Sequence, residues 1–275
     1  MRVLLAVGVV ALSLGCSRGV RPDSAVAGTK PVTGKVYSNE AGEQVTLIGL
    51  EPGDAHKALV AFEGTKSELD GQVLVAWVDQ DRGTQYWTQW RGRKQRFVTV
   101  NDRGGYEDLV FSGVNHEGYT HLRPDAGKTG ALKVEKLFER YQDLEGDKKY
   151  QALLAFDRKF WTNQAEVQLA DALAATNKAC GSKLTSTVAW DSITDDQLNK
   201  MSFGSYCVGP MESLQKLCER SDEAKRAVQQ KLQTVECRLD PKAALKLETQ
   251  KVIWAVAEGE TVQPDATTTF FTDNL

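Results

Sequence analysis

Residues 72–100 read QVLVAWVDQDRGTQYWTQWRGRKQRFVTV, and this stretch decides the fold of the first half of the chain. It contains three runs rich in β-branched and aromatic residues: Gln72–Asp79, Gln85–Trp90 and Arg96–Val100. Arg-Gly pairs separate these runs at 82–83 and 91–92. Runs of this length between glycine-containing turns are typical of antiparallel strands joined by hairpins. The stretch therefore predicts a β meander.

Two further runs of the same kind precede it, at Gln44–Leu50 and Ala58–Glu63, with Glu-Pro-Gly-Asp at 51–54 between them. Strand-like runs at regular spacing are typical of β-sandwiches and barrels. We therefore expect residues 31–125 to form a β-rich domain, an antiparallel meander folded as a small sandwich or an open barrel.

The apolar periodicity changes near Ala131. Apolar residues then recur at helical spacing at Leu132, Val134, Leu137, Phe138 and Tyr141. Residues 149–179 contain no Gly or Pro, and an apolar stripe runs through Leu153, Phe156, Phe160, Val167, Ala170 and Ala174. A repeat of three to four residues indicates amphipathic helices. We expect one or two helices here, ending at Cys180-Gly181, because glycine commonly terminates a helix.

The C-terminal part mixes both periods. Strand-like runs occur at Thr185–Trp190, Thr234–Leu239, Ala244–Glu248 and Lys251–Val256. Helical patterns occur just after Asp191 and at Pro210–Cys218 and Glu223–Leu232. We expect the end, from about Gly259, to be loose or to cover a sheet edge. Residues 130–275 are thus predicted to be helices followed by an α+β unit, and the whole chain is predicted to be α+β.

The N-terminus has the layout of a signal peptide. Met1-Arg2 is followed by an uninterrupted apolar run that ends at Cys16. The run is shorter than the roughly 20 residues that a membrane-spanning helix needs. We therefore expect residues 1–15 to be removed on export.

Leu12-Ser13-Leu14-Gly15-Cys16 resembles the lipobox of bacterial lipoproteins. The resemblance implies a diacylglycerol on the Cys16 thiol, cleavage before Cys16 and acylation of the new amino group. The family prefers Leu where this chain has Ser13, and an ordinary signal peptide is the alternative. Residues 16–30 read as a flexible tether. Ser17 stands where family sorting rules place Asp for inner-membrane retention, so the resemblance implies the outer membrane rather than the inner one.

The five cysteines fit this interpretation. If Cys16 carries lipid, Cys180, Cys207, Cys218 and Cys237 remain. Disulfides persist in exported proteins, so we expect two. Of the three connectivities, we favour Cys180–Cys207 with Cys218–Cys237, because each closes a local loop. A zinc site is the alternative, although zinc sites usually use close C-x-x-C pairs, and the chain has none.

Composition narrows the classes of function. A 275-residue chain with 41% apolar and 26% charged residues is ordinary for a globular protein, and its net charge of −3 gives no general attraction to nucleic acid. No phosphate-binding or dinucleotide-binding motif and no G-x-S-x-G motif occurs, so we expect no cofactor. His116, Glu117 and His121 are spaced unlike a metalloprotease helix, and a hydrated loop is the simpler interpretation.

The stretch 86–96 is the strongest candidate for binding. Its aromatic and cationic side chains include six candidate partner-binding residues: Trp87, Trp90, Arg91, Arg93, Lys94 and Arg96. Such side chains can stack on sugar rings and pair with glycan phosphates or carboxylates. The alternative is a buried strand face, with Tyr86, Thr88 and Trp90 on one side, followed by a charged turn.

Together these features predict a membrane-anchored lipoprotein of the cell envelope, a non-catalytic binding or scaffolding module for a protein or glycan partner. An envelope-polymer hydrolase and a surface inhibitor are the alternatives. A deep polar cleft would favour the enzyme, and an uncovered strand edge would favour the binder.

Overall fold

The computed structural model describes residues 24–52, 56–113, 118–260 and 264–275. These residues form two compact units. Unit 1 comprises the described residues up to Tyr86, together with Thr99–Val110 and His121–Gly146, and unit 2 comprises Trp87–Val98, Phe111–Thr120 and Asp147–Leu275. The predicted signal peptide, Cys16 and most of the predicted tether lie outside the described residues.

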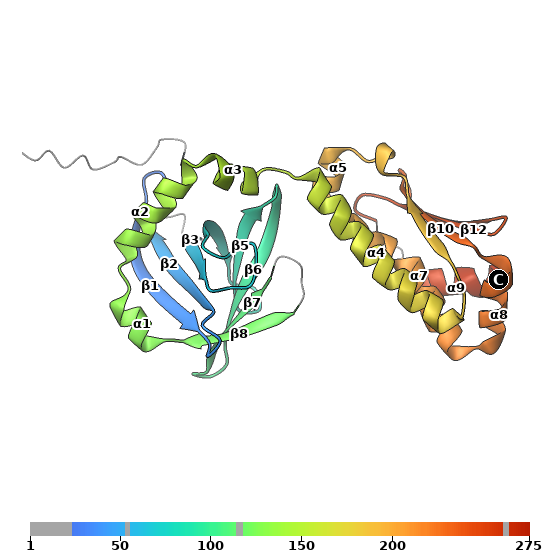
Figure 1. Ribbon diagram of the computed structural model, residues 1–275, viewed down its shortest axis with the longest axis horizontal. Helices are drawn as coiled ribbons and strands as arrows, with labels where there is room; N and C mark the ends of the chain where they lie inside the picture. The colour runs from blue at the N-terminus through green and yellow to red at the C-terminus, as the bar shows by residue number, and fades with distance from the viewer. Residues whose placement is uncertain (1–23, 53–55, 114–117, 261–263) are drawn as a thin grey trace, which may run out of the picture. The chain divides into compact units, whose positions relative to one another are not determined.

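Eight strands in sequence order form a closed barrel, visible in Figure 1. They are β1 (Lys30–Ser38), β2 (Gln44–Glu51), β3 (Lys57–Glu63), β4 (Val73–Asp79), β5 (Thr84–Trp90), β6 (Arg93–Asp102), β7 (Glu107–Ser112) and β8 (Tyr119–Pro124). The predicted antiparallel meander is confirmed. It is a closed barrel because β1 pairs with β8, Tyr37 opposite Pro124 and Ser38 opposite Arg123.

Two helices cover the outer side of the barrel beside β1 (Figure 1). They are α1 (Ala126–Ala131) and α2 (Val134–Glu145), and the predicted helical residues Phe138 and Tyr141 are buried. A Cβ on Gly34 of β1 would lie 2.3 Å from Leu132 Cδ2, so glycine permits this close approach. Val26, in the predicted tether, is fully buried, so packed structure begins before Lys30.

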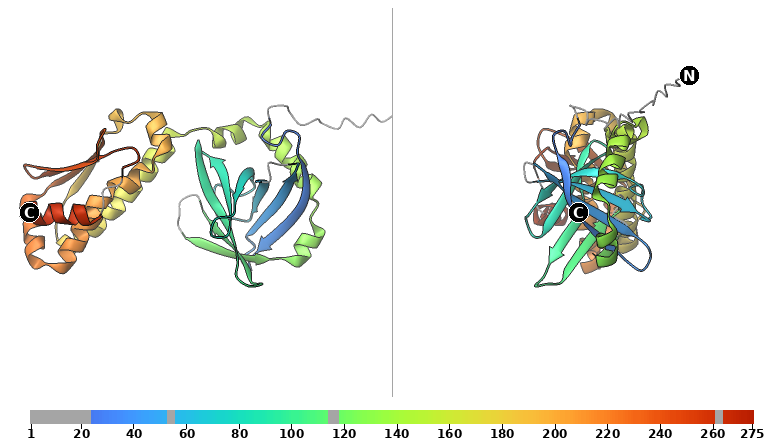
Figure 2. Two further views of the ribbon diagram at one scale, coloured as in Figure 1. Left: turned by 180° about the vertical axis from the view of Figure 1, so that it is seen from behind. Right: turned by 90° about the vertical axis from the view of Figure 1, so that its left-hand side faces the viewer.

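From Arg158 onward, unit 2 consists of helices against a four-stranded sheet (Figure 2), and one short helix, α3, precedes this part in the chain. The helical segments are α3 (Lys148–Leu154), α4 (Arg158–Cys180), η1 (Trp190–Ser192), α5 (Asp195–Lys200), α6 (Phe203–Cys207), α7 (Gly209–Arg220), α8 (Asp222–Lys231) and α9 (Pro264–Asn274). The strands are β9 (Thr185–Val188), β10 (Thr234–Leu239), β11 (Ala244–Glu248) and β12 (Lys251–Val256). The sheet order is β11-β12-β10-β9, in which β9, β10 and β12 are parallel and β11 is antiparallel.

The buried face of α4 differs from the predicted stripe. Val167 is 57% exposed, and Ala170 and Ala174 are also exposed. The buried residues are instead Ala165, Leu169, Thr176 and Cys180. The helix contains small or apolar residues on several sides, so its sequence supports more than one stripe, and packing against α7 selects the buried one. Gly181 has φ 62° and ends the helix, as predicted.

The C-terminal end is helical rather than loose. The sequence Thr-Thr-Thr-Phe-Phe lies in α9, and Thr267 and Phe271 are buried. Helix α9 packs against α7 and β11. β-Branched residues have only a weak bias against helix, and burial of an apolar face outweighs it.

Two disulfides form, as predicted, but the favoured pairing of Cys180 with Cys207 and of Cys218 with Cys237 is wrong. Cys180 bonds to Cys218, with Cα atoms 5.1 Å apart, and Cys207 bonds to Cys237, with Cα atoms 5.7 Å apart. Helices α4 and α7 lie side by side, and this packing brings together the helix ends that carry Cys180 and Cys218. The packing of elements therefore decides the pairing, and loop length in the sequence does not. No four-cysteine zinc site exists in this arrangement.

Within the described part of the chain, no helix has both the length and the apolar character needed to cross a membrane.

Candidate functional site

An open cavity of about 1070 Å³ lies in unit 1. Its apolar wall comes mainly from β1, β2 and β3, with Val78 and Tyr86 from β4 and β5. Its polar side chains are Lys30, Thr33, Lys35, Glu51, Lys57, Thr129 and the hydroxyl groups of Tyr37 and Tyr86. Small-molecule sites in proteins typically have volumes of about 300–1,000 Å³ and combine apolar walls with a few polar groups. An eight-stranded barrel is wide enough to hold one small ligand.

A polar cluster formed by Lys35, Tyr37 and Glu107 borders this cavity. Gly34 faces the covering helices, so the alternation along β1 turns Lys35 and Tyr37 to the barrel interior. Lys35 Nζ lies 2.5 Å from Glu107 Oε2, and the Tyr37 hydroxyl donates to Glu107 Oε1. One carboxylate thus holds a lysine and a tyrosine that are two residues apart on β1.

The electrostatics of the cluster favour an ionised Glu107. Burial alone would raise the pKa of Glu107, but hydrogen bonds from Lys35 and Tyr37 and the charge of Lys35 outweigh it, and its pKa is lowered. Burial and the neighbouring carboxylate raise the pKa of Tyr37. They also raise the pKa of Tyr86, again with burial as the larger cause. At neutral pH Glu107 is therefore a carboxylate, and Tyr37 and Tyr86 are neutral phenols.

The sequence-predicted binding residues separate into structural and exposed groups. Trp90 is fully buried, so it cannot stack on a ligand at the surface. Its ring packs edge-on against Phe97, with centroids 6.2 Å apart. Trp90 Nε1 and Thr88 Oγ1 are buried and have no hydrogen-bond partner among the described residues. The alternative interpretation of this strand as a buried face is therefore correct for Thr88 and Trp90.

Arg91 has a structural role within unit 2. Its guanidinium lies 2.6 Å from Asp157 Oδ2 and 4.3 Å from the centroid of the Phe160 ring. Asp157 also caps α4 by accepting from the Phe160 N–H. The Arg91 N–H donates to Leu153 O at 2.8 Å. Arg91 is thus engaged by residues of unit 2 on several sides and is not a free cation for a partner.

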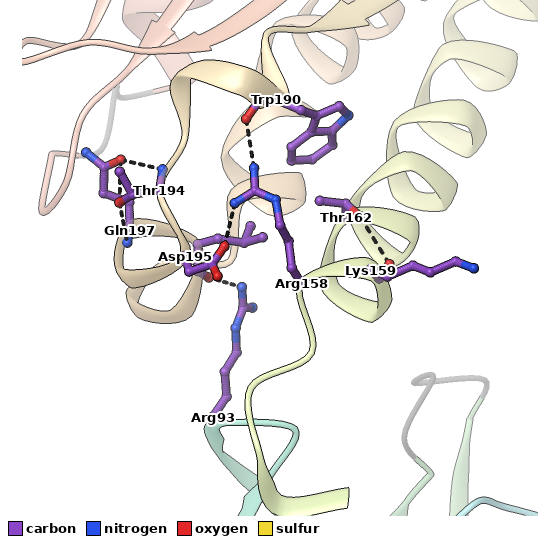
Figure 3. Close-up of polar contacts among 9 residues, drawn as sticks. Arg93, Arg158, Lys159, Thr162, Trp190, Thr194, Asp195 and Gln197 are labelled. Carbon is purple, nitrogen blue, oxygen red and sulfur yellow. Dashed lines mark hydrogen bonds and ion pairs between the residues drawn. The ribbon is translucent and has the colours of Figure 1, made fainter. Parts of the chain in front are cut away.

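Arg93 is engaged in the same way. Its guanidinium lies 3.9 Å from the centroid of the Trp161 ring and donates to the carbonyl of Leu198 near the end of α5. Cations are favourable at this end of a helix. Figure 3 shows Arg93 and Arg158 approaching the α5 region from different segments. Burial lowers the pKa of Arg93 to about 10, and the guanidinium stays charged at neutral pH.

Arg158, in the first turn of α4, contacts the same region around η1 and α5. It donates to Asp195 Oδ1 at 2.6 Å and to Trp190 O at 2.9 Å, as Figure 3 shows. Thr194 caps α5 in a reciprocal capping box with Gln197. The acidic start of α5 is thus explained by capping and by Arg158, as the sequence predicts for a helix N-terminus.

Trp87, Lys94 and Arg96 remain as a solvent-accessible group. Lys94 Nζ and Arg96 Cζ lie 5.4 Å and 5.6 Å from the centroid of the Trp87 ring. Lys94 and Arg96 are exposed, and Trp87 is partly exposed. Of the six predicted binding residues, these three retain the geometry of a surface that can meet an acidic partner.

The histidines give no metal site in the described part of the chain. His121 Nδ1 lies 2.8 Å from Asp108 Oδ2, whereas His116 and Glu117 lie outside the described residues. No group of three or more His, Cys, Asp or Glu side chains suited to a metal ion occurs in the described ranges.

Sequence reasoning missed the Lys35–Tyr37–Glu107 cluster. The alternation of β1 could have placed Lys35 and Tyr37 on one face. Glu107, however, is separated from Lys35 by 72 residues, and closure of the barrel brings it there. No short motif encodes that distance.

Comparison of the chain with protein family models, with curated proteins and with solved structures finds no match.

Proposed function

We propose that this chain is a non-catalytic binding protein of the cell envelope and that its ligand occupies the cavity of the barrel. The observation that carries the proposal is the open cavity of about 1070 Å³ beside the Lys35–Tyr37–Glu107 cluster. The apolar wall favours an apolar body, and the polar residues favour a head group at one end. The ligand proposed is a small amphiphile.

The charges around the cavity favour an anionic head group. Glu107 neutralises the charge of Lys35. The remaining charged residues of the lining are two lysines, Lys30 and Lys57, and one acid, Glu51, so positive charge is in excess. Lys57 Nζ donates to Ala25 O at 3.2 Å and can exchange that partner for a ligand oxygen. Tyr86 remains a neutral hydroxyl at physiological pH because its pKa is raised, mainly by burial. Hydrogen bonds to charged groups are the stronger ones, so the lysines would set the preference.

A fluorescent amphiphile tests this proposal. Dansyl-labelled undecanoic acid should bind saturably, at one molecule per chain, and more tightly than its methyl ester. Ala58, which is buried and lines the cavity, gives the decisive variant: Ala58→Trp should weaken binding at least tenfold. Ala174→Trp, at an exposed position of α4, is the matched control and should bind like the parent.

A charge-reversed variant distinguishes the contribution of the head group to binding from that of the apolar cavity. Lys30→Glu combined with Lys57→Glu should weaken binding of the acid and leave the ester unchanged. Absence of saturable binding by either probe, or equal binding by the Ala58→Trp variant, would refute the barrel as the binding site.

A second candidate is an acidic glycan on Trp87, Lys94 and Arg96. Two cations close to a partly exposed indole favour it, since sugars stack on such rings and their carboxylates can pair with the cations. Polygalacturonate should then quench the tryptophan fluorescence while dextran does not. The double variant Lys94→Glu, Arg96→Glu should abolish the effect. An unchanged response would reject this surface.

The proposed location is the outer membrane, with lipid on Cys16. The signal-peptide-like start and the lipobox-like Leu12–Cys16 support it, and the two disulfides fit an extracytoplasmic compartment. Cys16→Ser should abolish incorporation of labelled fatty acid and release the protein from membranes. A variant that stays with the membrane fraction would contradict the anchor.

A further inference from the structure

Strand β9 is an edge of the C-terminal sheet, and half of its backbone groups point away from the sheet. The Thr185 N–H donates to Gln233 O at 2.9 Å, and the Ala189 N–H donates to Cys237 O at 3.3 Å. In a parallel strand, alternate residues direct both N–H and C=O to the same side. The N–H and C=O groups of Ser186 and Val188 therefore point to the outer edge.

Just before β9, the outward-facing backbone groups of Leu184 are already hydrogen-bonded by a side chain of α4. Asn177 Oδ1 accepts from the Leu184 N–H at 2.8 Å, and Asn177 Nδ2 donates to Leu184 O at 3.0 Å. A side-chain amide thus acts as a short neighbouring strand for Leu184. The Asn177 amide pairs with Leu184 only. The backbone groups of Ser186 and Val188 face the same outer edge further along the strand.

An apolar groove follows this row. A cavity of about 450 Å³ lies between α4 and β9, and its apolar lining includes Leu169, Leu173, Val188 and Trp190. Leu184, Ser186 and Val188 share one face of β9 by the period of two, and all three line the groove. A free strand edge beside side-chain pockets is the arrangement used when an extended peptide adds to a sheet.

The charge of the groove indicates which peptide would fit. Glu166 is exposed and is the one charged residue among the described residues of the lining. Its Oε1 accepts from Trp190 Nε1 at 3.0 Å, and no donor to its Oε2 occurs in the described ranges of the chain. A Lys or Arg side chain on an incoming segment would meet this carboxylate.

We propose that β9 and the groove beside it bind an extended segment of a partner protein as an added strand. Backbone bonds to Ser186 and Val188 supply affinity, an apolar side chain enters the groove, and a basic residue pairs with Glu166. A second copy of this chain is a poorer occupant, because pairing of two β9 strands would bring together two copies of Glu166 of the same charge. The site is independent of the barrel cavity.

The probe is a panel of fluorescein-labelled eight-residue peptides in which one apolar residue type alternates with Thr, with either Lys or Glu at one end. Fluorescence anisotropy should show saturable binding to the purified protein, tighter for Lys than for Glu by about tenfold, which corresponds to about 1.4 kcal/mol. In an added strand, every second N–H of the peptide faces β9. N-methylation at those positions should weaken binding at least tenfold, and N-methylation at the intervening positions should not. Glu166→Lys should reverse the charge preference.

Ser186→Pro tests the edge itself. Its N–H faces away from β10, where proline is tolerated, so the substitution removes an outward donor and leaves the pairing with β10. Peptide binding should be lost in Ser186→Pro and kept in Ser186→Ala. If Ser186→Pro does not fold, Ala170→Trp fills the groove from α4 and Ala174→Trp is its matched control.

Several results would overturn the proposal. They are absence of saturable binding across the panel, equal sensitivity to N-methylation at all positions, and unchanged binding by both Ser186→Pro and Ala170→Trp. Dimerisation of the parent that Ser186→Pro abolishes would identify a second copy as the occupant and would also overturn it. The amphiphile assay of the barrel should be unaffected by Ser186→Pro, so failure of one site is distinguishable from failure of the other.

Discussion

Asn177 and Leu184 are joined by a reciprocal pair of hydrogen bonds, 2.8 Å and 3.0 Å long, in which a helix side chain satisfies both backbone groups of a residue at a strand entrance. Leu184 is buried, so no water can easily replace the amide. The pair connects the last turns of α4 to the edge of the sheet.

Asn177→Ala should therefore destabilise the protein by about 1–3 kcal/mol, because it leaves a buried N–H and a buried C=O without partners. Asn163→Ala, at an exposed position of the same helix, should change stability by less than about 0.5 kcal/mol. Urea unfolding followed by circular dichroism measures both. Equal effects of the two substitutions would show that the Leu184 contacts contribute nothing to stability.

The disulfides should each stabilise the fold substantially. Cys180 and Cys218 are separated by 38 residues, and Cys207 and Cys237 by 30 residues. Chain-entropy arguments then give about 3.5–4 kcal/mol for each bond. The double variant Cys180→Ala, Cys218→Ala should lose about that much in unfolding free energy. Non-reducing peptide mapping checks the pairing, and a peptide linking Cys180 to Cys207 would contradict it.

Glu107 should make stability depend on pH. Its pKa is lowered in the folded protein, since the hydrogen bonds from Lys35 and Tyr37 outweigh burial. A carboxyl group with a lowered folded pKa stabilises the fold above its unfolded pKa, about 4.3, and this contribution is lost as the pH falls through the folded pKa. The parent should exceed Glu107→Gln in stability at neutral pH, and the difference should shrink toward pH ~3. A difference that does not change between these pH values would contradict the assigned ionisation.

Gly92 should be far less tolerant of a side chain than Gly104. Both have a positive φ, 78° and 66°. A Cβ on Gly92 would lie 2.6 Å from the Cα of Phe156, whereas a Cβ on Gly104 would meet no atom within 4 Å. Alanine at either position costs about 1–2 kcal/mol of backbone strain, and Gly92→Ala adds the clash. Thermal unfolding should show a clearly larger loss for Gly92→Ala. Equal losses would mean that the Phe156 backbone moves away freely.

Much of the fold follows from local patterns. The strands Thr234–Leu239, Ala244–Glu248 and Lys251–Val256 have the bounds that alternation and turn residues predict. Their patterns are short, regular and flanked by breakers. Closure of the barrel was not predicted, because the bonds between β1 and β8 join residues that are far apart in the sequence.

The remaining errors have one physical origin, which is tertiary packing. Val167 is apolar and falls on the predicted buried stripe of the helix. In the folded chain, however, the side of α4 that bears Leu169 is buried and Val167 is exposed. Trp90, Arg91 and Arg93 look like a recognition surface because aromatic and cationic residues cluster there. The folded chain buries Trp90 and uses the two arginines to hold α4 and α5. Composition shows which groups can interact but does not identify their partners.

The two disulfide loops overlap, since residues 207–218 belong to both. A protease that cuts the backbone once, anywhere from residue 181 to residue 236, would therefore leave fragments still joined by at least one covalent bond. In a compartment where disulfides persist, such a nicked molecule would keep the part of unit 2 that follows the cut attached to the rest of the chain. The overlapping disulfides thus keep the fragments covalently linked after a single cut. Two separate local loops would give this protection over a shorter stretch of the chain.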